Sequence, residues 1–315
     1  MVKRIKGAFE IVAILVLSCL LLIGCLFALN FSTGNNSATI NKSNVQILAE
    51  HEIIINGTND DKANKWNEAI EYSISNDGVN VNVVLEDNWT AKDVVEAYHT
   101  SFGTGTGFSN GMILIPAGAK ITLDLNGKVI DRRMTESTSY GLVIYVKGGE
   151  LTILDSSCDN EDIIQKYNAV ENQPVSTQVN AIKQIGIGKI TGGASAGTGG
   201  GICVNENGIL NFNGGMICDN TYAPVGGGIY AGNSEINING GIIMNNESKT
   251  YGGGISIDNC NLVFNGGIIL GNLAKNDGGG IYATRSDITI NNVIIASNFS
   301  YHNGGGLYLT GGDLE

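Results

Sequence analysis

The sequence predicts an all-β solenoid, and three observations lead to that prediction. Glycine triplets begin at Gly199, Gly226, Gly252, Gly278 and Gly304, so they recur at intervals of 27, 26, 26 and 26 residues. Each repeat contains three short stretches in which apolar and polar residues alternate, and asparagine returns at two fixed places. A period between about 20 and 50 residues is typical of solenoids. Alternation with a period of two is typical of strands.

The three alternating stretches define the strands of one repeat. The first follows the glycine triplet, as at Ile229 and Ala231, and the second follows shortly after, as at Ile236 and Ile238. The third centres on an isoleucine that is the same residue type in every repeat: Ile217, Ile243, Ile269 and Ile295. We therefore expect a right-handed parallel β-helix of three-stranded coils, about 26 residues per coil, with these isoleucines stacked inward.

Turns between the strands explain the recurring asparagines. One series precedes the third strand and consists of Asn213, Asn239, Asn265 and Asn291; the other follows it and consists of Asn220, Asn246, Asn272 and Asn298. Identical asparagines stacked about 4.8 Å apart can hydrogen-bond to one another as ladders. Asparagine also tolerates the backbone of tight corners. The series therefore predicts structural turns and requires no chemistry.

The N-terminus indicates export. Lys3, Arg4 and Lys6 precede an apolar run that extends from Ile11 to Leu29, so residues 1–29 are either a signal peptide or a membrane anchor. Within this run, the residues before Cys25 resemble the bacterial lipoprotein box, which makes Cys25 a lipidation candidate. In each case the rest of the chain lies outside the membrane, extracellular at a bacterial cell surface or secreted.

The remaining chain divides by composition. Residues 30–44 are rich in Ser, Asn and Thr and predict a flexible tether. Residues 45–110 contain helix-like apolar spacing from Asp60 to Asn76 and predict a small α/β N-terminal cap. Residues 111–315 are assigned to the β-helix, with the polar stretch 156–187 as an inserted loop. Because the sequence stops within a repeat, we expect it to be a fragment with a truncated C-terminus.

Charge and cysteine content exclude several partners. The net charge is −12, with 18 Lys and Arg against 30 Asp and Glu, and nucleic-acid binding needs a surplus of cations. The four cysteines beyond the leader are Cys158, Cys203, Cys218 and Cys260, and they follow no spacing typical of metal ligands or of a disulfide framework. We expect no nucleic-acid partner, no metal and no cofactor.

The repeat also resembles a known group of proteins. The GGGI, NGG and downstream Asn pattern is preceded by ITLDLNGKVIDR at Ile121–Arg132 and by LTILDSS at Leu151–Ser157. Together these motifs resemble the right-handed parallel β-helix repeat proteins of the bacterial cell surface, and are similar to the repeats of polymorphic outer-membrane adhesins. The resemblance implies the fold and the location. It does not imply one activity, because the scaffold serves adhesins, passenger domains and polysaccharide lyases or hydrolases.

Two functions follow from that resemblance. The first is non-enzymatic adhesion or structural display, with a glycan or a host or cell-surface protein as partner. The alternative is a polysaccharide-active lyase or glycoside hydrolase, which would need carboxylates and cations on adjacent coils. The dense charge group at Asp124, Asp131, Arg132 and Arg133 is interpreted as turn decoration. No catalytic residue is therefore assigned.

A row of tyrosines is the candidate binding site. The position between the two inward residues of the first strand must point outward, and it carries Tyr145, Tyr230, Tyr282 and Tyr308, with Cys203 and Ser256 in between. Tyrosine offers a flat apolar face and a hydroxyl with little entropy to lose. The row could stack on sugar rings or on a partner protein, or it could only stiffen the sheet.

Two further surface features leave alternatives open. The residues that flank the inward isoleucines are apolar: Met216, Ile242, Ile268 and Ile294 on one side, and Cys218, Met244, Leu270 and Ala296 on the other. They form either an exposed stripe for lateral self-association or two rows of which one is turned inward by a bulge or a curved corner. Asp287 and Asp313, one repeat apart, are weak candidates for a shared hard cation such as calcium or are simple solvated acids.

Overall fold

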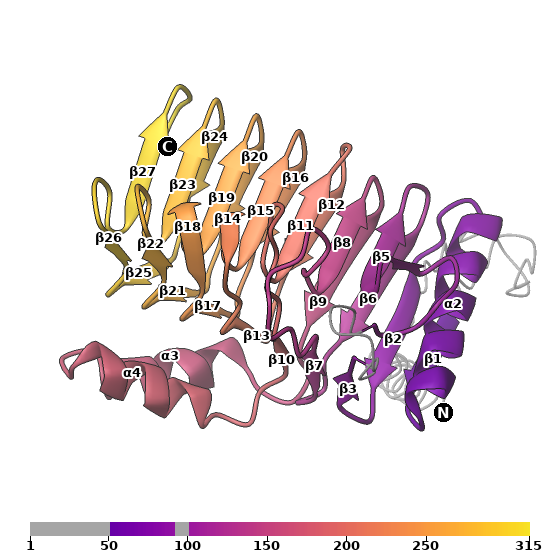
Figure 1. Cartoon of the computed structure of the whole chain (residues 1–315). Coiled ribbons are helices and arrows are strands. Elements are labelled where there is room, and N and C mark those ends of the chain that lie inside the picture. Colours follow the sequence, from indigo (N-terminus) through magenta and orange to yellow (C-terminus); the bar gives the residue numbers. More distant parts are fainter. Residues whose placement is uncertain (1–50, 92–100) are drawn as a thin grey trace, which may run out of the picture. The chain divides into compact units, whose positions relative to one another are not determined.

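The computed structural model describes residues 51–91 and 101–315, which lie in the compact unit that extends from His51 to Glu315 (Figure 1). In these ranges the strands form three long sheets and one short sheet, and every pairing between named strands is parallel except that of β4 with β5. This arrangement is compatible with a parallel β-helix.

The three long sheets are called A, B and C here, and the fourth is called the short sheet. Sheet A contains β1 (His51–Ile55), β2 (Val81–Leu85), β6 (Lys120–Asp124), β9 (Glu150–Leu154), β12 (Ile209–Phe212), β16 (Glu235–Ile238), β20 (Asn261–Phe264) and β24 (Asp287–Ile290). Sheet B contains β3 (Trp89–Thr90), β7 (Val129–Asp131), β10 (Lys189–Thr191), β13 (Met216–Cys218), β17 (Ile242–Met244), β21 (Ile268–Leu270) and β25 (Ile294–Ala296).

Sheet C contains β4 (Phe108–Ser109), β5 (Met112–Pro116), β8 (Ile144–Lys147), β11 (Ile202–Asn205), β15 (Ile229–Gly232), β19 (Ile255–Asp258), β23 (Ile281–Thr284) and β27 (Leu307–Thr310). The short sheet contains β14 (Ala223–Val225), β18 (Glu247–Tyr251), β22 (Leu273–Ala274) and β26 (Phe299–Ser300). From β11 onward, the chain contributes one strand to sheet C, one to A, one to B and one to the short sheet, and then returns to C. The short fourth strand was not predicted.

The pairing register equals the sequence period. Ile243 pairs with Ile217 on one side and with Ile269 on the other, and Ile269 pairs with Ile295. The first three of these isoleucines are buried in one continuous core, against which Ile295 packs. Because side chains alternate across a strand, the same register buries the alternate residues of sheets A and C. The alignment of the isoleucines predicted from the sequence is therefore found.

The structure does not support a separate N-terminal cap at residues 45–110. Strands β1 and β2 are the first two strands of sheet A. Val81, Val83 and Leu85 alternate as core residues, and β2 pairs in register with β1 and, over residues 81–84, with β6. The predicted helix is present as α2 (Asn59–Ser75), which begins with a capping box between Thr58 and Asp61. It packs against β1, β2 and β6.

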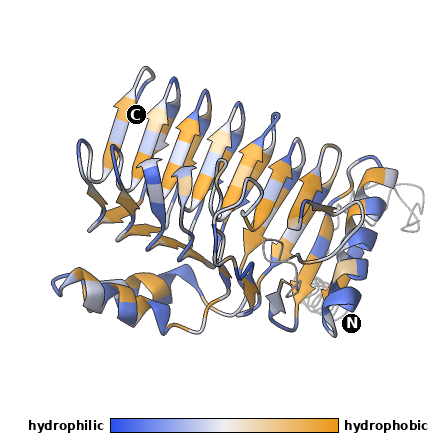
Figure 2. Cartoon of the chain, in the orientation of Figure 1, coloured by the Kyte–Doolittle hydropathy of each residue, from blue (hydrophilic) through white to orange (hydrophobic). Residues whose placement is uncertain are grey.

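Residues 156–187, predicted as a loop, contain two helices between β9 and β10. These are α3 (Asn160–Asn168) and α4 (Val175–Lys183), and both mix apolar with polar residues along their length (Figure 2). The sequence does contain the signal, because Ile163 and Tyr167 are four residues apart and Val179 and Ile182 three apart. Such pairs share one face of a helix, and all four side chains are buried.

The two helices cover the outer side of sheet B. Ile163, Tyr167, Val179 and Ile182 form a second apolar cluster with the flanking residues of β13, β17 and β21: Met216, Cys218, Ile242, Met244, Ile268 and Leu270. The prediction of an exposed stripe at these positions is wrong. The alternative that a bulge or curved corner turns one row inward is also wrong, because all six residues lie on the opposite side of sheet B from the inward isoleucines and in a different cluster.

Both asparagine series form the predicted ladders, but in different surroundings. Asn246 is buried, and its amide donates to the side chain of Asn272 at 3.1 Å and to the carbonyl of Ile217 at 2.9 Å. Asn265 is exposed, and its amide donates to the side chain of Asn239 at 2.8 Å. The two ladders flank sheet B: the exposed ladder precedes its strands along the chain, and the buried ladder follows them.

Candidate functional site

The predicted tyrosine row lies on the outer side of sheet C. Its neighbours along each strand, such as Ile281 and Ala283, are fully buried in the core, so the row points the other way. The pairing register connects the six positions in the expected order: Tyr145, Cys203, Tyr230, Ser256, Tyr282 and Tyr308.

Three tyrosines form a continuous stack in this region. The ring of Tyr282 lies 4.5 Å from that of Tyr251 at an interplanar angle of 22°, and 5.4 Å from that of Tyr308 at 8°. Tyr251 ends β18 and therefore comes from the short sheet. Ser256, the register partner of Tyr282, is small and buried. All three stacked side chains are half-buried.

Sequence reasoning missed Tyr251. It directly precedes a glycine triplet, where the other repeats carry Thr198, Val225, Asp277 and Asn303. This column has no common residue type, so periodicity does not single it out. Tyr251 reaches the ring of Tyr282 because the short sheet lies beside sheet C.

Tyr145 and Tyr230 behave differently from the stacked tyrosines. Both pack against a small apolar cluster of Met112, Leu142 and Cys203. Their burial raises the pKa of both hydroxyls above the ordinary value, because desolvation disfavours the phenolate. The prediction that the whole row stands freely outward is therefore too simple. Tyr282 and Tyr308, with Tyr251, make the part of the row that is organised as a stack.

Charged side chains accompany the aromatic ones. Arg285 makes a bidentate pair with Asp258, with Nε to Oδ1 at 2.9 Å and Nη2 to Oδ2 at 2.5 Å. In and beside the short sheet, the ammonium of Lys249 lies 5.5 Å from the ring centroid of Tyr222, and that of Lys275 lies 5.5 Å from the centroid of Tyr301. Such cation–π pairs add about 0.5–1 kcal/mol at exposed sites. They extend the aromatic surface beyond sheet C.

Of the two candidate cation ligands, Asp287 uses its carboxylate within the protein. The Oδ1 atom of Asp287 accepts a hydrogen bond from the backbone N–H of Asp313 at 3.0 Å. Asp287 also lines a small turn pocket of 180 Å³ with Arg285, whose cation disfavours a second cation nearby. Over residues 51–91 and 101–315, no group of three or more His, Cys, Asp or Glu side chains is arranged to hold a metal.

The dense charge group also has structural tasks. Asp124 Oδ1 accepts from the backbone N–H groups of Asn126 and Ser156, each at 2.9 Å. Asp131 Oδ1 accepts from the backbone N–H of Arg133 at 2.9 Å. Arg132 is buried against the ring of Phe102, and desolvation lowers its pKa to about 10. These contacts agree with the interpretation of Asp124 and Asp131 as turn residues, but that interpretation is wrong for Arg132, which is buried.

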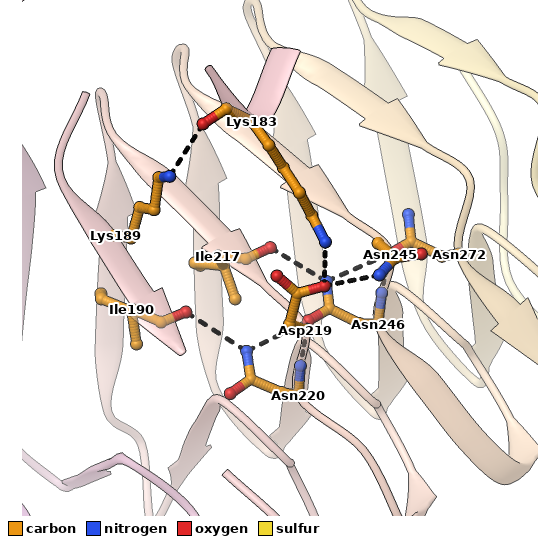
Figure 3. Close-up of polar contacts among 9 residues, drawn as sticks. All are labelled: Lys183, Lys189, Ile190, Ile217, Asp219, Asn220, Asn245, Asn246 and Asn272. Carbon is orange, nitrogen blue, oxygen red and sulfur yellow. Dashed lines mark hydrogen bonds and ion pairs between the residues drawn. The ribbon is translucent and has the colours of Figure 1, made fainter. Parts of the chain in front are cut away.

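Polar contacts attach the inserted helices to the repeats (Figure 3). Lys183, the last residue of α4, pairs with Asp219, whose carboxylate also accepts from the amide of Asn245 at 2.5 Å. The ammonium of Lys189 donates to the carbonyl of Lys183 at 2.9 Å. The buried asparagine ladder begins one residue after Asp219. The helices are therefore held both by apolar packing and by charges at the end of the sheet B strands.

Comparison with known proteins gives no identification. No protein-family model matches the chain, and no curated protein or solved structure shows significant similarity to it.

The predictions for the N-terminus lie outside the described residues. They concern the signal peptide or anchor at residues 1–29, the tether at 30–44 and lipidation of Cys25. Among the described helices, none has the length and apolar character required to cross a bilayer.

Proposed function

We propose that this chain is an exported bacterial cell-surface protein built on a right-handed parallel β-helix, and that it adheres to a glycan or a surface protein through its tyrosine stack. Two features support the fold and the location: the parallel register that repeats every 26 residues over β15 to β27, and the basic and apolar N-terminal sequence.

The stack of Tyr251, Tyr282 and Tyr308 carries the proposal for adhesion. Two of its rings, those of Tyr282 and Tyr308, are nearly parallel, with an interplanar angle of 8°. Stacked rings lose little side-chain entropy when a partner binds, which lowers the cost of association. Tyrosine also combines an apolar body with a hydrogen-bonding tip. A sugar chain or an extended protein surface has the matching mixture of apolar faces and polar groups.

The test compares a triple variant with its parent. We expect the parent to bind at least one class of ligand on a glycan array or a panel of purified matrix proteins. The Tyr251→Ala, Tyr282→Ala, Tyr308→Ala variant should lose at least about tenfold in affinity, or about 1.4 kcal/mol. Tyr140→Ala is the matched control, because Tyr140 is exposed and lies outside the stack.

Two results would overturn this proposal. Equal binding by the parent and the folded triple variant would remove the stack from the binding surface. Release of reducing sugars or unsaturated uronides from a polysaccharide panel by the parent would instead establish the enzymatic alternative.

A further inference from the structure

An open pocket lies between α3 and the turns that connect sheet A to sheet B. Its volume is 390 Å³, which is within the range of about 300–1,000 Å³ for small-molecule sites. One wall belongs to the first half of α3, and the other belongs to the turns after β16, β20 and β24. The lining residues are Asn160, Glu161, Ile164, Gln165, Asn239, Asn265, Gly266, Gly267 and Asn292.

The helix wall is fixed by Asn160. Its amide donates to the carbonyl of Asn213 at 3.1 Å, and its carbonyl oxygen accepts from the backbone N–H of Gly241 at 2.9 Å. A Cβ atom on Gly240 would approach the Asn160 amide nitrogen to 2.1 Å. Gly240 therefore lets Asn160 insert between two successive turns. The pocket walls are held in place before any ligand binds, which reduces the ordering cost of binding.

The pocket contains polar groups that the protein itself does not use. Within the described part of the chain, the side chains of Glu161, Gln165 and Asn292, which line the pocket, have no hydrogen bond to protein. Asn239 and Asn265 each use one amide hydrogen and one carbonyl lone pair in the exposed ladder. Since an amide has two donors and two acceptor sites, each of them keeps further capacity. Donors and acceptors therefore face the pocket from both walls.

The charge of the lining restricts the ligand. It contains the carboxylate of Glu161, four asparagines and one glutamine, but no Lys or Arg. The chain as a whole carries −12. An anionic ligand would be repelled and would lack the cationic partner that carboxylate or phosphate recognition normally uses. Ile164 adds an apolar contact.

We infer that this pocket binds a neutral oligosaccharide. Sugar hydroxyls both donate and accept hydrogen bonds, as carboxamides do, and sugar C–H faces can pack on Ile164. Two successive ladder carboxamides, Asn239 and Asn265, line the pocket, so two sugar units can meet equivalent groups. This inference does not rest on the proposed function, because the pocket lies at the sheet A to sheet B turns and shares no residue with the tyrosine stack.

The experiment titrates the protein with oligosaccharides, and binding is measured by calorimetry and by ligand-observed NMR. The probes are an N-acetylglucosamine trisaccharide and a β-linked glucose tetrasaccharide, with a galacturonate trisaccharide as the anionic comparison. We expect at least one neutral probe to bind and the anionic probe not to bind. Gln165→Ala, Asn292→Ala should weaken binding at least about tenfold. Lys166→Ala, Asn168→Ala is the matched control, since both residues are exposed on α3 and outside the lining.

Each outcome decides the inference. It is overturned if neither neutral probe binds at millimolar concentration, if the galacturonate binds as tightly as the neutral sugars, or if the pocket variant binds as well as the control. If the tyrosine triple variant abolishes binding and the pocket variant retains it, only the proposed function survives. The reverse pattern supports the pocket and not the stack.

Discussion

The outer sides of sheets B and C differ in what covers them. Both sheets alternate inward apolar residues with an outward row, and both stack at the same period. The outward rows of sheet B are aliphatic or sulfur-containing and are buried under α3 and α4. The outward row of sheet C is largely tyrosine and remains half-buried. An apolar row needs a cover, whereas tyrosine can pack its ring and keep its hydroxyl in water.

Both sides depend on the same core, so an inward substitution should have the largest effect. Ile269 is 1% exposed and lies in the central column of sheet B. Ile269→Ala should reduce the free energy of unfolding by about 2–5 kcal/mol through the cavity it leaves. Ile269→Asp should unfold the neighbouring repeats, because it buries an unpaired carboxylate. Thermal unfolding followed by circular dichroism measures both. Retention of the parental melting temperature by Ile269→Asp would contradict the inward register.

Removing the cover should expose sheet B and leave sheet C intact. Ile182 in α4 is fully buried in the cluster beneath the helices. Ile182→Asp should detach α4 and uncover the aliphatic rows, so we expect concentration-dependent association by analytical ultracentrifugation. The tyrosine stack should keep its ligand affinity. Lys166→Ala serves as the control, because Lys166 is exposed on α3. A variant that stays monomeric at every concentration would show that these rows do not drive association.

The outer sides of sheets B and C each contain one buried thiol, so the two regions can be compared by measuring the free energy of unfolding as a function of pH. Burial raises the pKa of Cys218, under the helices, to about 12, and that of Cys203, in the tyrosine row, to about 11, from 9.0. As pH rises above 9, the unfolded chain loses these protons first. The free energy of unfolding should therefore fall, by up to about 1.4 kcal/mol per pH unit for each thiol, until the folded thiol ionises.

Denaturant titrations between pH 8 and pH 11 measure this loss, and the alanine variants assign it. Cys203→Ala and Cys218→Ala should each flatten the decline over this range. Cys158→Ala is the comparison and should flatten the decline least: burial raises the pKa of Cys158 too, but its side chain is only partly buried. An unchanged slope in both test variants would mean that neither thiol is buried as described.

The smallest expected effect is the difference in stability loss between substitutions in the two asparagine ladders that flank sheet B. Asn246→Ala leaves buried backbone and amide partners unsatisfied and should cost about 1–3 kcal/mol. Asn265→Ala removes an exposed ladder contact, where water replaces the lost partner, and should cost less than about 1 kcal/mol. Urea unfolding of the two variants side by side measures the difference. Equal costs would argue against the burial difference between the ladders.

Local sequence patterns predicted the repeat well, because each pattern recurs. The period, the inward isoleucines and both asparagine ladders repeat in four or more units. A register shift by one residue would move every core side chain outward. The outward row with Tyr282 and Tyr308 follows from the same alternation. Each of these features depends on contacts between residues one repeat apart, and that spacing is read directly from the sequence.

Contacts between segments of unlike sequence were decided only by the tertiary structure. Residues 156–187 occur once, and their helices bury Met244 and Leu270 from a distance of more than sixty residues along the chain. Tyr251 joins the stack only because the short sheet lies beside sheet C. The pocket needs Asn160 inserted beside Gly240. Periodicity predicts how one repeat packs on the next repeat. It does not predict which non-repeated segment packs on the outside of the sheets.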